Sequence, residues 1–364
     1  MNENNEAQNH ENQPLRIIQT ENPEKEIWKM LGYFESEKNA KDFLLEKLPQ
    51  NCEIDELSKN LSIDMQVAEE YFRAAQSVSL LTRPLLIYYG MINIAKVVHI
   101  SCEGKIPEGK KHGLVTVKPW NFVLADLSVK IKQYGIFPEF YHCYSREELH
   151  TSVFSLKHLL SQIPEVKVAF ETVYKEKSLA LKVVKARYGV SIVDSELEKY
   201  TGLNELLANI PKLKKHSNRM QMFDDHAFLF AANWDNENQY TPALSGEKFL
   251  ILPIKCEDGT FRLLNELSTH FLIMFMLGMT ARYHPKVWAD AIKGEESGDI
   301  YVIQNFLDVT TRKFPNLILN ELRNRKFIFS TPRIAVNKTG LTEEQLEQAY
   351  EYVNRKFVDS MRGY

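Results

Sequence analysis

The sequence predicts an α+β fold that is predominantly α-helical, with a small antiparallel sheet and a disordered N-terminal tail. Apolar residues recur at helical spacing along most of the 364-residue chain, and a few short β-branched runs interrupt them. The hydrophobic fraction of 44% and the charged fraction of 26% are ordinary globular values. A chain of this length can bury a large core without a metal ion or a disulfide.

The N-terminal segment, residues 1–24, is rich in Asn, Glu and Gln and holds few large apolar side chains. Such a segment cannot offset the entropy lost on ordering, so we predict a disordered tail there. Helical spacing begins near Ile27 and is interrupted around Gly32. Residues 52–81 predict two short helices joined at NLSID, and the second has too few basic residues to bind DNA as a recognition helix.

The stretch RPLLIYYGMINIAKVVH, residues 83–99, predicts a central helix over residues 84–100. Thr82 can cap its start, and Pro84 suits the first helical position because the missing N–H has no acceptor there. Apolar side chains cover almost the whole circumference, which is typical of a helix buried in the core. The arginine, lysine and histidine in this stretch are therefore candidate functional residues.

Capping residues and turns predict the remaining elements. Ser145 and Glu148 form a capping box for a helix that ends before Pro164. Antiparallel strands are predicted within 182–193, 249–264 and 326–332, the second of them with a turn at EDG. Further helices are predicted over 265–281, 301–322 and 342–358, with an additional segment around HPKVWADAI. The apolar run FLIMFMLGMTA is shorter than the roughly 20 residues that a membrane span needs, so it predicts a buried helix.

No linker stands out in the sequence. We therefore expect a single large domain over residues 25–364, and the second option is two parts joined near Pro211. The net charge of −3 shows no overall excess of positive charge for nucleic acid or a membrane surface. The four cysteines lie far apart without a CxxC pair, and no apolar signal segment precedes them. We expect free thiols, a cytoplasmic location, and neither a cofactor nor a metal site.

Three segments together resemble the YaaC-like family of bacterial proteins: LLTRPLLIYYGMINIAKVV, SLKHLLSQIPEV and LIMFMLGMTARYHPKVW. They occur in the family's order, and the resemblance spans roughly residues 74–288. It implies a mostly helical protein of the bacterial cytoplasm. It implies no reaction, cofactor or catalytic residue, so catalytic residues stay unassigned.

Familiar catalytic motifs are missing from the sequence. There is no GxGxxG, GxxxxGK[ST], HExxH or GxSxG. P-loop nucleotide hydrolysis, zinc peptidase chemistry and α/β-hydrolase chemistry are therefore disfavoured.

A cationic pocket beside the apolar helices is the leading functional hypothesis. Arg83 lies at a helix start, where backbone N–H groups favour an anion, and Arg282 follows a buried helix. If the fold brings them together, they form a clamp for a carboxylate or phosphate. The expected partner is a small anionic, nucleotide-like ligand or a protein. The predicted binding residues are Arg83, Tyr89, Asn93, Lys96, Arg282 and His284. The alternative is that Arg282 only stabilises the end of its own helix.

Two rival functions stay open. A metal-independent ribonuclease of the HEPN type, acting in defence or stress arrest, would use an Arg and a nearby His, and Arg146 with His150 or Arg262 with His270 are the candidates. Neither spacing matches the pattern of that type. RNA is therefore a less favoured partner. The basic cluster KLKKHSNR, residues 212–219, does not change this, because such a cluster is typical of a solvated loop. The other rival is a non-catalytic scaffold.

Overall fold

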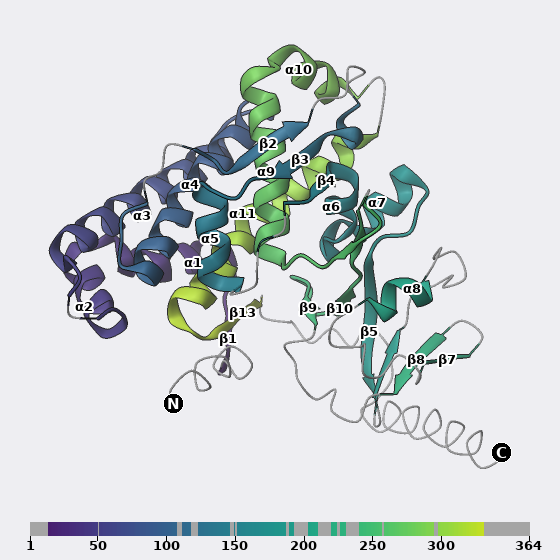
Figure 1. Ribbon diagram of the computed structural model, residues 1–364, viewed down its shortest axis with the longest axis horizontal. Coiled ribbons are helices and arrows are strands. Elements are labelled where there is room, and N and C mark those ends of the chain that lie inside the picture. Colours follow the sequence, from purple (N-terminus) through teal and green to yellow (C-terminus); the bar gives the residue numbers. More distant parts are fainter. Residues whose placement is uncertain are drawn as a thin grey trace.

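Long helices form the larger part of the molecule, and short strands flank them (Figure 1). The computed structural model describes residues 14–49, 51–107, 111–117, 123–145, 149, 151–186, 189–192, 203–209, 220–223, 226–230, 240–256, 258–294 and 298–330. The longer helices are α1 (Pro23–Leu31), α2 (Glu37–Lys47), α3 (Ile54–Ser77), α4 (Arg83–Glu103), α5 (Ile136–Ser145), α9 (Glu266–Tyr283), α10 (Pro285–Lys293) and α11 (Asp299–Arg323). The shorter ones are α6 (Leu156–Ser161), α7 (Lys167–Tyr174) and α8 (Leu203–Ala208), with 3-10 turns η1 (Gly32–Glu35), η2 (Leu124–Asp126) and η3 (Pro164–Val166). The predicted, predominantly helical α+β fold is thereby confirmed.

Helix α4 runs through the helical part and packs against α3, α5 and α9. Pro84 lies in its first turn as predicted, whereas the Thr82 side chain makes no capping hydrogen bond. The helix ends at Gly104, whose left-handed φ of 62° directs its N–H to the carbonyl of Ile100. Of the described helices, α4 alone is long and apolar enough to suit a membrane span, but 67% of that stretch is buried inside the protein. Such burial is typical of a core helix in a soluble protein.

Two glycines let the neighbouring helices approach α4 closely. A Cβ on Gly90 of α4 would lie 2.6 Å from the ring of Phe72 on α3. A Cβ on Gly278 of α9 would lie 3.0 Å from Cβ of Tyr88 on α4. The main core is therefore built around three helices that touch through these small residues.

The strands of the described residues form four sheets. The largest is antiparallel and has the order β7-β8-β6-β5-β10-β9. Its strands are β5 (Ala180–Ala186), β6 (Gly189–Ile192), β7 (Met220–Phe223), β8 (His226–Phe230), β9 (Thr241–Pro242) and β10 (Lys248–Ile251). A second antiparallel sheet joins β2 (Leu114–Val117), β3 (Ser128–Ile131) and β4 (Val153–Ser155), and a hairpin joins β11 (Ile254–Lys255) to β12 (Phe261–Arg262). The antiparallel strands predicted within 182–193 are confirmed as β5 and β6, and those on either side of EDG as β11 and β12.

The six-stranded sheet has a small core of its own, separate from the core of the helical part. Figure 1 shows this sheet to one side of the helices. The single domain over residues 25–364 stays a prediction. The segment around Pro211 and the helix expected over 342–358 lie outside the described residues.

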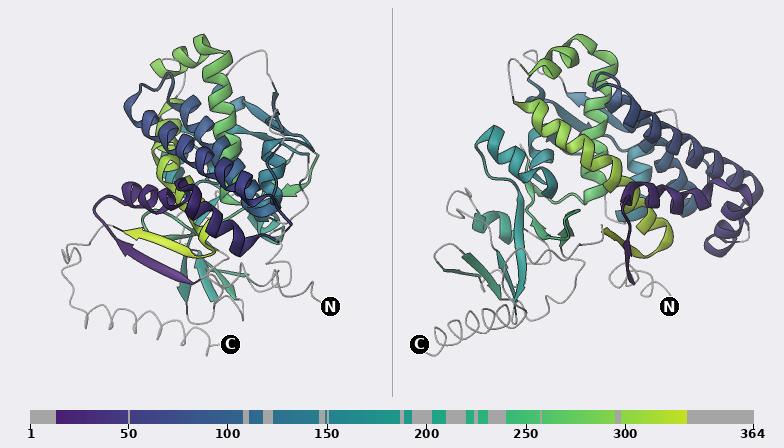
Figure 2. Two further views of the ribbon diagram at one scale, coloured as in Figure 1. Left: turned by 90° about the vertical axis from the view of Figure 1, so that its left-hand side faces the viewer. Right: turned by 180° about the vertical axis from the view of Figure 1, so that it is seen from behind.

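The predicted tail is too long at its C-terminal end. Residues Leu15–Gln19 form β1, which pairs in parallel with β13 (Lys326–Ser330) so that Leu15 lies opposite Lys326 (Figure 2). Backbone hydrogen bonds to this distant strand order LRIIQ, which lies at the end of a stretch rich in Asn, Glu and Gln. The same pairing corrects the expected antiparallel sheet, because the strand predicted within 326–332 joins β1 instead. Residues 1–13 lie outside the described residues.

Two predicted helix boundaries are wrong as well. Residues 54–77 form one continuous helix, α3, because NLSID contains no Gly or Pro and the Ser62 hydroxyl bonds to the Lys59 carbonyl within the helix. Ser145 is the last residue of α5, and residues 146–148, which include its predicted capping partner Glu148, lie outside the described residues. Within the predicted helix, Val153–Ser155 form strand β4, and Ser155 caps the short helix α6.

Candidate functional site

Arg83, the first residue of α4, connects this helix to α11. Its Nη1 lies 2.7 Å from Oδ1 of Asp308, and its side chain is only 19% exposed. Nε of the same guanidinium is shielded from solvent and has no hydrogen-bond partner among the described residues. A buried donor without an acceptor costs about 1–3 kcal/mol, so a ligand oxygen that reached it would be favoured.

Four of the six predicted binding residues form a connected polar strip on α4 and α9. The Arg282 guanidinium donates to the Tyr89 hydroxyl and lies 5.8 Å from the centroid of that ring. The Asn93 amide donates to the Tyr89 carbonyl at 2.9 Å. Lys96 Nζ lies 2.9 Å from Oδ1 of Asn93 and 3.0 Å from Oδ1 of Asp64 on α3. These contacts hold three helices together.

The predicted clamp between Arg83 and Arg282 is not seen in the described part of the chain. Arg83 pairs with Asp308, whereas Arg282 contacts Tyr89, and Arg282 does not line the cavity beside Arg83. Arg282 lies in the last turn of α9, where a cation stabilises the helix end. His284 is half-buried between α9 and α10, and its N–H donates to a carbonyl of α9. The surroundings of Arg282 therefore favour the alternative, in which this residue stabilises the end of its own helix.

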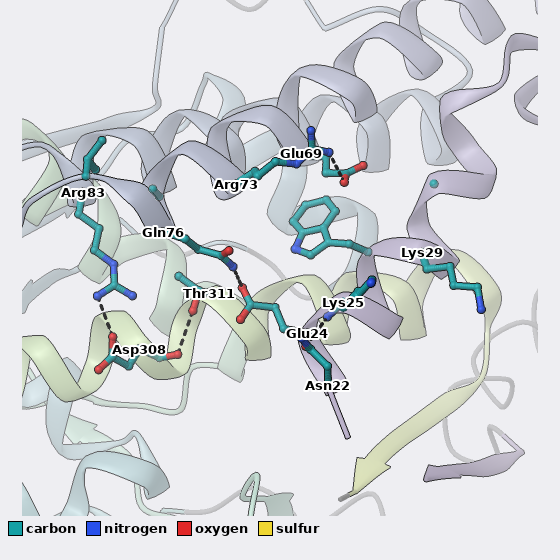
Figure 3. A pocket seen from close by; sticks show the side chains of 14 residues that line it. Asn22, Glu24, Lys25, Lys29, Glu69, Arg73, Gln76, Arg83, Asp308 and Thr311 are labelled. Atoms are coloured by element: carbon teal, nitrogen blue, oxygen red, sulfur yellow. Dashed lines mark hydrogen bonds and ion pairs between the residues drawn. The ribbon is translucent and has the colours of Figure 1, made fainter. Parts of the chain in front are cut away.

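A cavity of about 790 Å³ lies beside Arg83, between α1, α3, α4 and α11 (Figure 3). Trp28, a buried residue of α1, contributes an aromatic wall. The charged side chains that line it are Lys25, Lys29, Arg73, Arg83, Glu24, Glu69 and Asp308. Positive side chains exceed negative ones by one in this lining, so the cavity is mildly cationic.

Most carboxylates of the lining already have partners from within the protein. Glu69 pairs with Arg73 one turn along α3, and Glu24 accepts from the amide of Gln76. The first turn of α1 also faces the cavity, where Asn22 caps it by accepting from the N–H of Lys25 at 3.0 Å. The start of α4 faces the cavity too, so two helix N-termini add positive potential to it.

Glu35, in η1, forms a carboxyl pair with Glu69 at the edge of this cavity. Burial and the neighbouring Glu69 raise the pKa of Glu35 to about 7, and protonated Glu35 can donate a hydrogen bond to Glu69. Glu35 Oε1 is shielded and has no hydrogen-bond partner among the described residues. Two carboxyl groups this close share one proton, because both cannot ionise without repulsion.

The residues considered for a ribonuclease do not form an exposed pair where they are described. His270 is fully buried in α9, with Nδ1 2.7 Å from Oγ1 of Thr310. Burial lowers the pKa of His270 to about 3, so the ring is neutral near pH 7 and RNA cannot reach it. Arg262 lies on β12. Arg146 and His150 lie outside the described residues, and a ribonuclease using them stays a prediction.

Sequence reasoning missed most of the cavity lining. Lys25, Trp28 and Lys29 come from α1, and Asp308 comes from α11. The Asn22–Pro23 start signal of α1 was detectable, but it fell within the segment predicted as a tail. The contribution of α11 had no local signal, because only the fold brings Asp308 to Arg83.

Comparison with known proteins gives one match. The family model described as YaaC-like Protein matches residues 32–322 of the chain. No curated protein and no solved structure matches. The matched range holds the α3, α4 and α11 walls of the cavity, whereas the wall formed by α1 precedes it. Because the match covers well over half of the sequence, this chain belongs to the YaaC-like family.

Proposed function

We propose that this protein binds a small anionic ligand of nucleotide size in the cavity between α1, α3, α4 and α11. The observation that carries the proposal is the Arg83 guanidinium. Its Nη1 is anchored by Asp308 while its shielded Nε still lacks an acceptor among the described residues. Because Arg83 lines the cavity, a phosphate or carboxylate oxygen in the cavity would accept hydrogen bonds from this guanidinium once the side chain turns toward it.

The size and chemistry of the cavity support the same proposal. About 790 Å³ is within the range of pockets that hold nucleotide-sized ligands. Lys25 and Lys29 lie on successive turns of α1 at its edge, and the buried Trp28 offers an apolar surface to a planar ring. In this proposal the protein acts in the bacterial cytoplasm, as the family resemblance implies, and binding precedes any reaction that other residues would perform.

The test is a thermal-shift and calorimetry panel with ATP, AMP and inorganic phosphate on the full chain. We expect at least one of these anions to raise Tm, and we expect Arg83→Gln to weaken its binding about tenfold or more. Arg282→Gln is the matched control, because Arg282 is an exposed arginine near α4 that does not line the cavity.

Each other outcome has a defined meaning. Equal losses in Arg83→Gln and Arg282→Gln would restore the predicted two-arginine clamp and contradict the present cavity. A folded Arg83→Gln protein that binds as tightly as the parent would remove the proposal. Failure of all three anions to bind, together with a stable protein partner recovered by pull-down, would favour the scaffold.

A further inference from the structure

The C-terminal end of α4 brings together cysteines that are far apart in the sequence. Cys102 and Glu103 are the last two residues of α4, and Cys143 lies on α5. The two Sγ atoms and a carboxylate oxygen of Glu103 all lie within 4.8 Å of one another. Cys102 and Glu103 are exposed, and Cys143 is half-buried, so a solute ion can reach the group. The sequence has no CxxC motif at this group, because the packing of α4 against α5 brings the two cysteines together.

We propose that Cys102, Cys143 and Glu103 bind a divalent, borderline-soft transition-metal ion of the Zn²⁺ class. Two thiolates and a carboxylate are ligand types that this class accepts, with metal–sulfur distances of about 2.3 Å. An ion bound tetrahedrally to both sulfurs holds them about 3.8 Å apart. Sulfurs that already lie within 4.8 Å need a shift of at most about 1 Å to meet this geometry.

The electrostatic setting favours a cation at this end of the helix. The C-terminus of α4 carries the negative end of the helix dipole, and its last turn contains no basic residue.

Polar groups without partners lie one turn further into the same helix interface. His99 precedes Glu103 by four residues on α4, and Glu139 precedes Cys143 by four residues on α5. Nδ1 of His99 and Oε2 of Glu139 are shielded, and neither has a hydrogen-bond partner among the described residues. Burial lowers the pKa of His99, and the neighbouring Glu139 opposes this shift.

Three ligands from the protein leave one position of a tetrahedral ion open. Closed structural zinc sites use four protein ligands, so the proposed site is one that exchanges its ion or binds a further ligand. Binding releases one proton from each thiol that is protonated beforehand, and affinity should therefore rise with pH.

The experiment titrates the reduced, metal-free full chain with Zn²⁺ against a chromophoric chelator, and with Co²⁺ as a spectroscopic probe. We expect one ion per chain and a sulfur-to-cobalt charge-transfer band. Cys102→Ser and Cys143→Ser should each weaken binding at least tenfold and remove or shift the band. Cys256→Ser is the matched control, because that thiol lies next to β11 and away from the group.

Glu103→Gln provides a variant that should fold normally, since Glu103 is exposed. It should weaken binding while keeping the charge-transfer band, because both sulfurs remain. Unchanged Zn²⁺ affinity in folded Cys102→Ser and Cys143→Ser proteins would overturn the proposal. Recovery of a Cys102–Cys143 disulfide by mass spectrometry, without metal binding after reduction, would overturn it in favour of a redox pair.

Discussion

At the scale of single residues, the Glu35–Glu69 pair makes stability depend on pH. The pKa of Glu35 is raised from 4.5 to about 7 in the folded protein, so the folded state holds a proton that the unfolded chain releases above 4.5. This contribution to stability is complete below pH 4.5 and is lost as pH rises through 7. Glu35→Gln should therefore make Tm less dependent on pH between these values and raise it above pH 7, as measured by calorimetry.

Glu46→Gln is the control for this prediction. Glu46 is an exposed carboxylate on α2, and its replacement should leave the pH dependence of Tm as it is in the parent. If Glu35→Gln and the parent lose stability equally between pH 4.5 and 7, the shared proton does not exist. Binding of an anion in the neighbouring cavity should weaken over the same range, because ionised Glu35 adds negative charge beside Glu69.

The sequence identified one member of the candidate site by a local rule. Arg83 follows from its place before Pro84 at a helix start, a signal contained in adjacent residues. Its partner Asp308 lies more than two hundred residues away, and no local pattern links the two. The expected role of Arg282 requires it to lie beside Arg83. The fold instead places its guanidinium against the Tyr89 ring.

At the scale of helices, close packing at Gly90 explains one residue of the Tyr88–Tyr89–Gly90 sequence on α4. Tyr88 bonds to His112 at 2.9 Å, Tyr89 accepts from Arg282, and Gly90 leaves room for the Phe72 ring. Each of these three residues therefore joins α4 to a different part of the fold.

Gly90→Ala should destabilise the protein by about 1–3 kcal/mol, because the new methyl group would lie 2.6 Å from Phe72. Alanine's higher helix propensity, about 1 kcal/mol, offsets only part of this cost. Urea unfolding gives the measurement, and Phe72→Leu in the Gly90→Ala background should cost less than Phe72→Leu alone. A Gly90→Ala protein at least as stable as the parent would show that α3 and α4 separate easily.

Helix prediction succeeded where periodicity and capping agreed. Asn265 caps α9 by accepting from the N–H of Ser268 at 2.9 Å, and the apolar run that follows is buried as predicted. Prediction failed in α3, where serines that favour turns bond within a continuous helix. It failed again at β1, whose order comes from a strand partner and not from its own residues.

At the scale of the whole molecule, the pairing of β1 with β13 should stabilise the C-terminal end of α11. Phe327 and Phe329 of β13 are buried in the main core, and β1 satisfies the backbone of that strand. A chain that starts at residue 20 should show a lower Tm than one that starts at residue 14. Amide hydrogen exchange should also be faster over residues 326–330. Equal exchange in the two chains would mean that β13 is held by its side chains alone.

The same pairing has a consequence for synthesis on the ribosome. Leu15–Gln19 leave the exit tunnel before the described helices, whereas their partner strand is translated after them. Contacts between such distant segments form late, because the intervening chain must first be ordered. The nascent chain therefore carries an unpaired strand while all the helices between β1 and β13 are synthesised, and the closing of β1 onto β13 reports that these helices have folded.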